Sequence, residues 1–378
     1  MEYVALKDVC KIIMGQSPDS SSYNRNEEGL PFFQGNADFG ERYPVTRVWC
    51  NAPTKIAQQE DILISVRAPI GALNYAGEEC CIGRGLAALT PNRSKVSSEF
   101  IYWLLKGKNA ELNSKGTGST FKAISRKILE EIMIPNVDLK KQHKYAEILE
   151  KTYSVICKRK EELQHFDDLI KARFIEMFGD PVSNPLGWKK KMLKEICIKL
   201  NDGTHFSPES FETGEYKYIT AKNIKTSGFD FTNITYVPEE VHRPIYERCN
   251  PEWGDVLYIK DGVTTGIAMV NTLEEEFTLL SSVALLKQDR RIINGYFLTA
   301  LLNNENMYAD IRSNMGGAAI TRLTIAKLNT IKVILPPLEL QEQFAFFVAQ
   351  IDKSKAVVQK ALDETQLLFD SLMQKYFG

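Results

Sequence analysis

Residues 138–188 read DLKKQHKYAEILEKTYSVICKRKEELQHFDDLIKARFIEMFGDPVSNPLGW, and this stretch organises the rest of the chain. An apolar residue recurs in it every seven positions, at Leu149, Ile156, Leu163, Ile170 and Met177. The sustained heptad predicts one long helix over about 140–178. At about 1.5 Å per residue this helix would be roughly 58 Å long. Glycine and proline are absent until Gly179 and are frequent over 179–187, which predicts that the helix ends there.

The composition is that of a soluble protein with more than one domain. A chain of 378 residues with 44% hydrophobic and 25% charged residues predicts two or three domains. No apolar run approaches the ~18 residues that a membrane span needs, and the first residues, MEYVALKDVCK, do not resemble an export signal. Seven cysteines without a C-x-x-C pair indicate reduced thiols, so we expect a cytoplasmic protein. A net charge of −1 neither indicates nor excludes binding to nucleic acid.

The segments before and after this helix are similar to each other. Leu6-Lys-Asp-Val-Cys10 returns as Leu193-Lys-Glu-Ile-Cys197, and Asp61-Ile-Leu63 returns as Asp255-Val-Leu257. The offset between the two copies increases along the chain, which indicates loop insertions in the second copy. Both copies alternate short strand-like runs with turns and short helices, so each predicts a mixed α/β (α+β) globular domain.

The helix itself also returns. A second heptad series begins 199 residues after Leu149, at Val348, Lys355, Leu362, Phe369 and Tyr376. The motif Pro135-x-x-x-Leu139-x-x-Gln142 is matched with Pro336-x-x-x-Leu340-x-x-Gln343. Two helices with matching apolar seams can bury them on each other, and a short linker between the copies favours an antiparallel coiled coil. The sequence therefore predicts an internal pseudo-two-fold repeat. Polar residues in the seams, Arg159, Arg173 and Lys355, would set the register.

These patterns divide the chain into five segments. We expect a first globular domain over 1–139, a central helix over 140–178, a linker over 179–187, a second globular domain over 188–338, and a C-terminal helix over 339–378 that pairs with the central one.

Catalytic motifs are missing from the sequence. There is no G-x-x-x-x-G-K-S/T loop for a nucleotide and no Asn-Pro-Pro-Tyr-like methyltransferase box. The linker sequence Asn184-Pro185-Leu186-Gly187 is best interpreted as a turn. The four histidines, His143, His165, His205 and His242, lack the spacing of metal ligands, so we expect no bound metal.

The loops instead carry side chains of the kinds that contact DNA. Glutamine, asparagine, serine and similar groups read base edges, whereas lysine, arginine and threonine suit phosphates. Any one of them alone could be an ordinary solvated loop residue, but the set is repeated in both copies. The candidates in the first copy are Gln16, Ser17, Tyr23, Asn24, Gln34, Asn36, Arg67, Lys115, Thr117, Ser119 and Lys122. Those in the second copy are Thr204, His205, Ser207, Lys222, Asn223, Lys260, Thr321 and Arg322.

The chain resembles the specificity subunits of type I restriction–modification systems over nearly its whole length. The similarity lies in the order of its motifs: Gly15-Gln16-Ser17-Pro18, Pro31-Phe-Phe-Gln-Gly35, Asp61-Ile-Leu-Ile-Ser-Val-Arg67-Ala-Pro-Ile-Gly71, Asp202-Gly-Thr-His205 and Ile334-Leu-Pro-Pro-Leu-Glu-Leu-Gln-Glu-Gln343. It also includes the repeat and the paired helices.

The resemblance implies a non-catalytic DNA-binding subunit. One target-recognition domain would read each half of a bipartite double-stranded DNA site, and the coiled coil would set the gap between the halves. Two methyltransferase subunits, and restriction subunits in the full complex, would be its partners. S-adenosylmethionine, ATP and magnesium would bind those partners and not this chain. Two alternatives stay open from the residues alone: a coiled-coil scaffold that binds proteins through its two heads, and an enzyme with an unrecognised active site.

Overall fold

The structure, a computed structural model, describes residues 2–118, 122–313 and 322–378. The chain divides into two units. The first unit holds Met1–Lys160 and Lys360–Gly378, and the second holds Glu161–Gln359. Each unit therefore contains one globular segment and one end of each long helix. This division follows the packing and cuts through both helices, unlike the predicted boundaries at 139 and 338.

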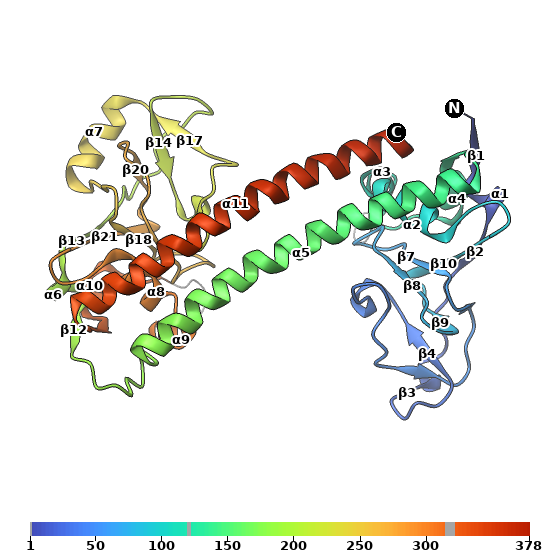
Figure 1. Cartoon of the computed structure of the whole chain (residues 1–378), viewed down its shortest axis with the longest axis horizontal. Coiled ribbons are helices and arrows are strands. Elements are labelled where there is room, and N and C mark those ends of the chain that lie inside the picture. The colour runs from blue at the N-terminus through green and yellow to red at the C-terminus, as the bar shows by residue number, and fades with distance from the viewer. Residues whose placement is uncertain (1, 119–121, 314–321) are drawn as a thin grey trace. The chain divides into compact units, whose positions relative to one another are not determined.

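Two helices of 40 residues each carry the heptad series (Figure 1): α5, Leu139–Phe178, and α11, Leu338–Phe377. Both predicted helices are confirmed, and each begins one residue earlier than expected. The carboxylate of Asp138 accepts a hydrogen bond from the main-chain N–H of Lys141 at 2.9 Å and caps α5. Gly179, at φ 71°, ends α5 in the left-handed conformation that glycine adopts without strain.

In the first unit, the N-terminal half of α5 packs on the C-terminal end of α11. Tyr145 of α5 and Tyr376 of α11 stack with ring centroids 4.0 Å apart. Leu149 and Ile156 of α5 and Phe369 of α11 are buried along the same seam. Apolar burial of this kind supplies most of the stability of a helix pair.

In the second unit, the opposite helix ends meet. Phe174 and Phe178, near the end of α5, each lie 5.7 Å from the ring centroid of Phe344, near the start of α11. Val348 of α11 is buried one turn further on. The contacts within the two units together make the helix pair antiparallel, as predicted. The other predicted pairing residues are buried (Leu362) or half-buried (Leu163, Ile170 and Met177).

The polar seam residues are accommodated by hydrogen bonds and ion pairs. Arg159 of α5 donates to the hydroxyl oxygen of Thr365 on α11. Lys355 of α11 pairs with Asp167 of α5 at 2.6 Å. Arg173 pairs with a glutamate on its own helix, three residues further along. Two of the three therefore bridge the helices, as expected for residues that fix a register.

The first unit is built on a four-stranded antiparallel sheet in the order β2-β10-β7-β8. A two-stranded sheet, β1-β11, and four short helices complete this frame. The strands are β1 (Tyr3–Ala5), β2 (Cys10–Met14), β7 (Ile62–Ser65), β8 (Leu73–Tyr75), β10 (Leu86–Pro91) and β11 (Met133–Pro135). The helices are α1 (Leu6–Val9), α2 (Ser98–Gly107), α3 (Asn109–Ser114) and α4 (Arg126–Glu130).

The second unit repeats this frame element by element. Its main sheet has the equivalent order β13-β21-β18-β19, and β12 pairs with β22. The strands are β12 (Lys190–Met192), β13 (Cys197–Asp202), β18 (Val256–Ile259), β19 (Ala268–Val270), β21 (Val283–Gln288) and β22 (Lys332–Ile334). The helices are α6 (Leu193–Ile196), α8 (Gly295–Leu302), α9 (Glu305–Ser313) and α10 (Ile325–Thr330). The predicted internal repeat is thus present as a repeated topology.

The matched aspartates have the same role in both copies. Asp61 precedes β7 and Asp255 precedes β18, and both are buried. The carboxylate of Asp61 accepts the main-chain N–H of Gln58 at 2.9 Å, and that of Asp255 accepts the N–H of Glu252 at 2.9 Å. An aspartate that closes a turn in this way fixes where the following strand begins.

The two units differ outside the frame. The first carries a five-stranded sheet, β3-β5-β4-β9-β6, and the second carries a three-stranded sheet, β17-β14-β20, a hairpin, β15-β16, and an additional helix. The first set is β3 (Tyr23–Asn24), β4 (Leu30–Phe33), β5 (Trp49–Cys50), β6 (Ile56–Ala57), β9 (Cys80–Ile82), η1 (Ser20–Ser22) and η2 (Asn36–Asp38). The second set is β14 (Tyr216–Ile219), β15 (Ile224–Lys225), β16 (Gly228–Phe229), β17 (Thr235–Val237), β20 (Thr278–Leu279), α7 (Glu239–Arg248) and η3 (Ala221–Asn223). These elements account for the predicted insertions.

A buried glutamine ties each long helix to its own globular segment, and it corrects one motif match. The side chain of Gln142 accepts the main-chain N–H of Ser97 at 2.9 Å, and that of Gln341 accepts the N–H of Asn294 at 2.9 Å. The sequence match of Gln142 with Gln343 was therefore wrong by two residues. Gln343 is exposed, and the prolines that guided the match precede the two helices at different distances.

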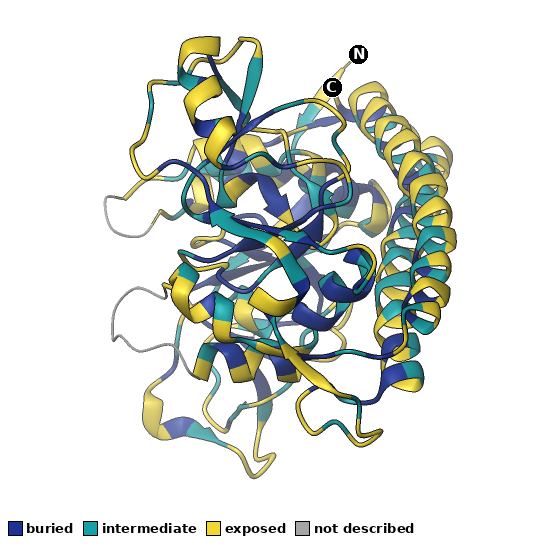
Figure 2. Ribbon diagram, turned by 90° about the vertical axis from the view of Figure 1, so that its left-hand side faces the viewer, coloured by how far each residue is buried: buried dark blue, intermediate teal, exposed yellow. Residues whose placement is uncertain are grey.

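Each frame is completed by an aromatic residue near the C-terminal end of the long helix that follows the other globular segment. In the first unit, Phe369 of α11 lies 5.6 Å from Trp103 of α2. In the second unit, Phe178 of α5 lies 4.8 Å from Phe297 of α8. These rings are buried, while the outer faces of both long helices are exposed (Figure 2). All seven cysteines are free.

Replacing Phe369 with alanine should lower the free energy of unfolding of the first unit by about 3–5 kcal/mol, because it leaves a cavity beside Trp103. Urea denaturation followed by circular dichroism measures the loss. Leu367, an exposed residue of the same helix, provides the control, and Leu367→Ala should change the free energy by about 0.5 kcal/mol or less. Equal losses in the two variants would contradict this packing.

Candidate nucleic-acid interface

Each of the two candidate loops leaves its frame at a glycine that lies against a neighbouring strand. A Cβ atom on Gly15 would overlap the main-chain carbonyl oxygen of Gly83. A Cβ atom on Gly203 would overlap the carbonyl oxygen of Leu279 in the same way. Only glycine allows so close an approach of two backbones. The candidate residues that follow each glycine therefore start from equivalent points in the two units.

In the second unit, these loops meet in a cluster of charged side chains. Lys260, directly after β18, is 1% exposed, and its ammonium group lies 2.8 Å from a carboxylate oxygen of Asp261 and 3.3 Å from one of Asp202. His205 Nε2 lies 3.1 Å from the other oxygen of Asp202, and Arg322 Nε lies 3.4 Å from Asp261. A buried ammonium group needs such carboxylates, since an unpaired charge in the interior is costly. Three candidates that are far apart in sequence thus share one cluster.

In the first unit, an apolar residue stands where Lys260 stands in the second. Val66 is buried, and its carbonyl oxygen accepts the N–H of Ile124 at 2.9 Å, as the carbonyl oxygen of Lys260 accepts the N–H of Leu323 at 2.8 Å. The next residue, Arg67, is exposed and is bridged to Ala123.

Two further candidates adjoin Arg67. Ala123 also bridges to Thr117, and the carbonyl oxygen of Lys122 accepts the N–H of Ala68 at 3.1 Å. Arg67, Thr117 and Lys122 therefore come together on the surface of the first unit. The corresponding position of the second unit carries the cluster around Lys260, so the same frame presents different charges in its two copies.

The remaining candidates are distributed over both units. Gln16, Gln34, Arg67, Lys115, Thr117, Lys122, His205, Ser207, Lys222 and Arg322 are exposed. Ser17, Tyr23, Asn24 and Asn36 are half-buried, and Thr204, Asn223 and Lys260 are buried. Ser119 and Thr321 lie outside the described residues. Over the described chain, the side chains of Gln16, Gln34, Arg67, Lys122 and Lys222 form no hydrogen bond or ion pair, so they are available to a ligand.

The side chains of several candidates form hydrogen bonds within their own loops. Asn223 accepts the N–H of Thr220 at 3.0 Å and donates to the carbonyl oxygen of Asp230 at 3.1 Å. Tyr23 donates its hydroxyl to the carbonyl oxygen of Pro18 at 2.9 Å, and burial raises the pKa of this phenol above its ordinary value. Asn24 accepts two main-chain N–H groups of its own loop at 3.1 Å. These side chains shape the loops, and their contact with DNA stays a prediction.

Three residues of the charged cluster, Arg248, Asp202 and Asp261, were not among the candidates from the sequence. Arg248, at the end of α7, donates to the carbonyl oxygen of Gly203 and lies 3.6 Å from a carboxylate oxygen of Asp202. It belongs to the helix that is inserted only in the second copy, so neither the repeat nor a motif could indicate it. Asp202 lay within a quoted motif, but nothing in the sequence showed that it would be buried beside Lys260.

Metal sites and membrane-spanning helices are absent from the described residues. Over residues 2–118, 122–313 and 322–378, no three His, Cys, Asp or Glu side chains gather as a metal site would require. In the same part of the chain, no helix is both long enough and apolar enough to cross a membrane.

The chain is similar to known proteins over its whole length. A family model described as Type I restriction modification DNA specificity domain matches it twice, over residues 1–165 and 185–365. A protein called the type I restriction enzyme MjaX specificity subunit, from Methanocaldococcus jannaschii, is 48% identical over 155 residues, which are 41% of this chain and 36% of that protein. This similarity thus spans only about a third of that relative.

Two other similarities extend over both chains. The type I restriction enzyme MjaIX specificity subunit of Methanocaldococcus jannaschii is 23% identical over 98% of this chain and 91% of its own length. The solved structure of the type I restriction–modification system S subunit from M. genitalium is 17% identical, with a TM-score of 0.62 over 100% of this chain and 96% of that one. The predicted fold is therefore confirmed, with two mixed globular domains and a pair of long helices.

Replacing Lys260 with valine, the residue at the equivalent place in the first unit, should cost about 3–5 kcal/mol of folding free energy, because it removes the buried ammonium group that the carboxylates of Asp202 and Asp261 share. Urea denaturation at neutral pH measures the loss. Lys222→Val, at an exposed site, is the control. Equal losses in Lys260→Val and the control would contradict the ionic role of Lys260.

Proposed function

Because the chain belongs to the type I restriction–modification DNA specificity family, we propose that it is the non-catalytic subunit that selects the DNA sequence. Each unit would read one half of a bipartite double-stranded site. The chain would direct adenine methylation by two methyltransferase subunits and cleavage by restriction subunits. S-adenosylmethionine, ATP and magnesium would then be bound by those partners.

One observation carries this proposal: the two units have the same frame and different outer elements. The order β2-β10-β7-β8 returns as β13-β21-β18-β19, whereas a five-stranded sheet in one unit is replaced by a three-stranded sheet, a hairpin and α7 in the other. A bipartite reader needs this combination. Equal frames present both readers in the same manner, and unlike loops let them read different bases.

The exposed polar groups support a division of roles between the loops. Gln16 and Gln34 carry amides without a partner among the described residues, and such groups can form paired hydrogen bonds with an adenine edge. Arg67 and Lys122 adjoin each other and suit phosphate contacts. In the second unit, His205 and Arg322 emerge from the cluster around Lys260 and would take corresponding roles.

The helix pair would set the gap between the two half-sites. Both helices run through both units without interruption, and they are joined by buried aromatic contacts at each end. A continuous helix has a fixed rise of about 1.5 Å per residue. The number of helical residues would therefore determine the number of unread base pairs, as the spacing of half-sites follows protein geometry in dimeric DNA-binding proteins.

Deleting the gene should remove one set of methylated adenines from the chromosome, because the methyltransferase would lose its sequence reader. Mapping of modified bases in cells with and without the gene measures this. The same methylated adenines in both kinds of cell would contradict the proposal. Gel shifts with the co-purified methyltransferase complex separate the scaffold alternative, which predicts no affinity for DNA.

Lengthening both helices by one heptad, after Lys160 in α5 and before Lys360 in α11, should widen the gap in the recognised site by about three base pairs. Seven residues add about 10.5 Å, and a base pair occupies about 3.4 Å. The heptad keeps the apolar seams in register. The methylated sequences report the gap. A heptad added to α5 alone is the control and should abolish recognition, while an unchanged gap in the double insertion would contradict the spacer role.

A further inference from the structure

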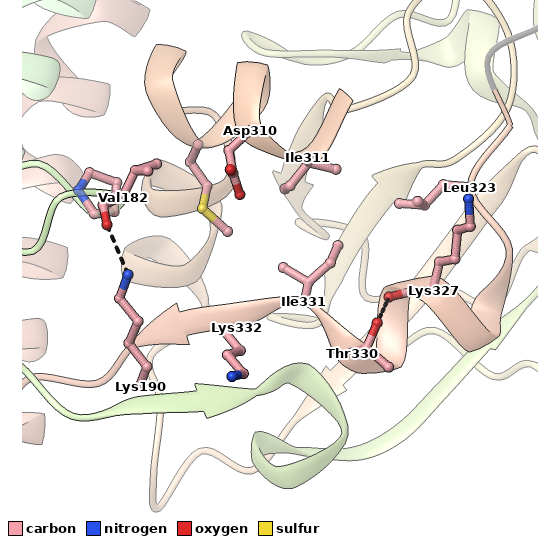
Figure 3. Close-up of a pocket in the computed structure, with 11 residues that line it drawn as sticks. Val182, Lys190, Asp310, Ile311, Leu323, Lys327, Thr330, Ile331 and Lys332 are labelled. Carbon is pink, nitrogen blue, oxygen red and sulfur yellow. Dashed lines mark hydrogen bonds between the residues drawn. The ribbon is translucent and has the colours of Figure 1, made fainter. Parts of the chain in front are cut away.

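A hollow of about 470 Å³ lies in the second unit, and the proposed DNA recognition does not use it (Figure 3). Its walls come from β22, α9, α10, the start of β12 and residues 181–182 after α5. Figure 3 shows Ile311, Leu323 and Ile331 turned toward its middle. With Met307 they form an apolar floor, although the hollow is open to solvent at its rim.

The rim of this hollow is positively charged. Lys190 and Lys327 lie at its opposite ends and Lys332 on the strand between them, and all three are exposed (Figure 3). Among the described residues, none of their ammonium groups is within 4.0 Å of a carboxylate. Residues 314–321, which are not described, contain neither aspartate nor glutamate. Asp310 is the one acidic residue among those that line the hollow.

The frame does not require these lysines, since the first unit lacks them. Tyr3 of β1 pairs with the last residue of β11, as Lys190 of β12 pairs with the last residue of β22. Lys332 opens β22 where Met133 opens β11. The residue of α4 that corresponds to Lys327 is Ile128, at the same distance from the strand that follows. All three positions are uncharged in the first unit.

Two lysines at the corresponding place in the first unit have carboxylate partners. Lys127 of α4 pairs with Glu131 at 3.7 Å, and Lys108 pairs with Glu111 at 2.9 Å. The second unit has replaced Glu131 by Thr330 at the corresponding position, next to the hollow. A cationic rim over an apolar floor is therefore a property of one unit only.

We propose that this hollow binds an acidic peptide segment of a partner protein, with one large apolar side chain of the segment placed on the floor. The carboxylates of the segment would meet the three lysines, of which Lys190 also donates to the carbonyl oxygen of Val182 at 2.9 Å. The apolar side chain would cover Ile331 and its neighbours. A DNA phosphate could meet the lysines but would leave the half-buried side chain of Ile331 in water, since Met307, Ile311 and Leu323 are already buried. Since the first unit has no such rim, each chain binds one copy of the segment despite its repeated frame. This site is independent of the DNA-reading role.

The test uses the full chain and a fluorescently labelled peptide in which glutamates and aspartates flank a central phenylalanine. Anisotropy should show saturable binding of one peptide per chain. The double variant Lys327→Glu, Lys332→Glu should bind at least about tenfold more weakly at about 50 mM salt, and the difference should shrink near 0.5 M salt, where charges are screened. A peptide with glutamine and asparagine in place of the acids should bind as weakly as the variant does.

Two controls separate this site from general charge effects. The variant Lys194→Glu, at an exposed lysine of α6 outside the hollow, should bind the peptide with the same affinity as the unchanged chain. Polyglutamate, which lacks the apolar side chain, should compete poorly. The proposal is overturned if no saturable binding occurs up to about 1 mM peptide, or if Lys194→Glu loses as much affinity as the double variant. It is also overturned if the double variant loses affinity for a short DNA duplex and keeps its affinity for the peptide.

Discussion

Neither globular segment can complete its core with its own residues, and the rest of the structure depends on this constraint. The rings of Phe100 and Trp103 in the first unit are covered by Phe377 and Phe369, from the far end of the second long helix. Phe297 in the second unit is covered by Phe174 and Phe178 of the first long helix. Burying aromatic rings contributes several kcal/mol of stability each. Both cores therefore depend on aromatic residues of the antiparallel helices α5 and α11.

The sequence predicted those elements whose pattern is local. The heptad from Leu149 to Met177 specified a helix to within a residue, because apolar spacing and the glycine that ends it lie within one stretch. The repeat was also visible in the sequence, because the aspartates that precede β7 and β18 are followed by similar residues, Asp61-Ile-Leu63 and Asp255-Val-Leu257. The motif match at Gln343 failed because proline spacing is a weak guide to register, whereas the hydrogen bonds of Gln142 and Gln341 are tertiary and leave no local signal.

The candidate site was less predictable for the same reason. Side-chain type suggested Lys260 and Asn223 as DNA contacts, yet burial and hydrogen bonding within the unit depend on segments far away in sequence. The sequence around Lys260 contains no signal that Asp202 lies beside it, or that Arg248 of the inserted helix contacts Asp202. A repeated frame with unlike loops would meet two demands of the proposed function at once: equal presentation and different chemistry. Only the first demand leaves a periodic pattern.

The reciprocal completion of the two cores also bears on how the chain folds during synthesis. The rings that cover Phe100 and Trp103 belong to residues 369–377, about 230 positions after the first globular segment ends and α5 begins at Leu139. At synthesis rates of about 5–20 residues per second, roughly 12–46 s pass before those rings are synthesised. During this interval an aromatic surface of the first unit stays open to solvent. Final folding of the N-terminal half thus waits for the last turns of the C-terminal helix.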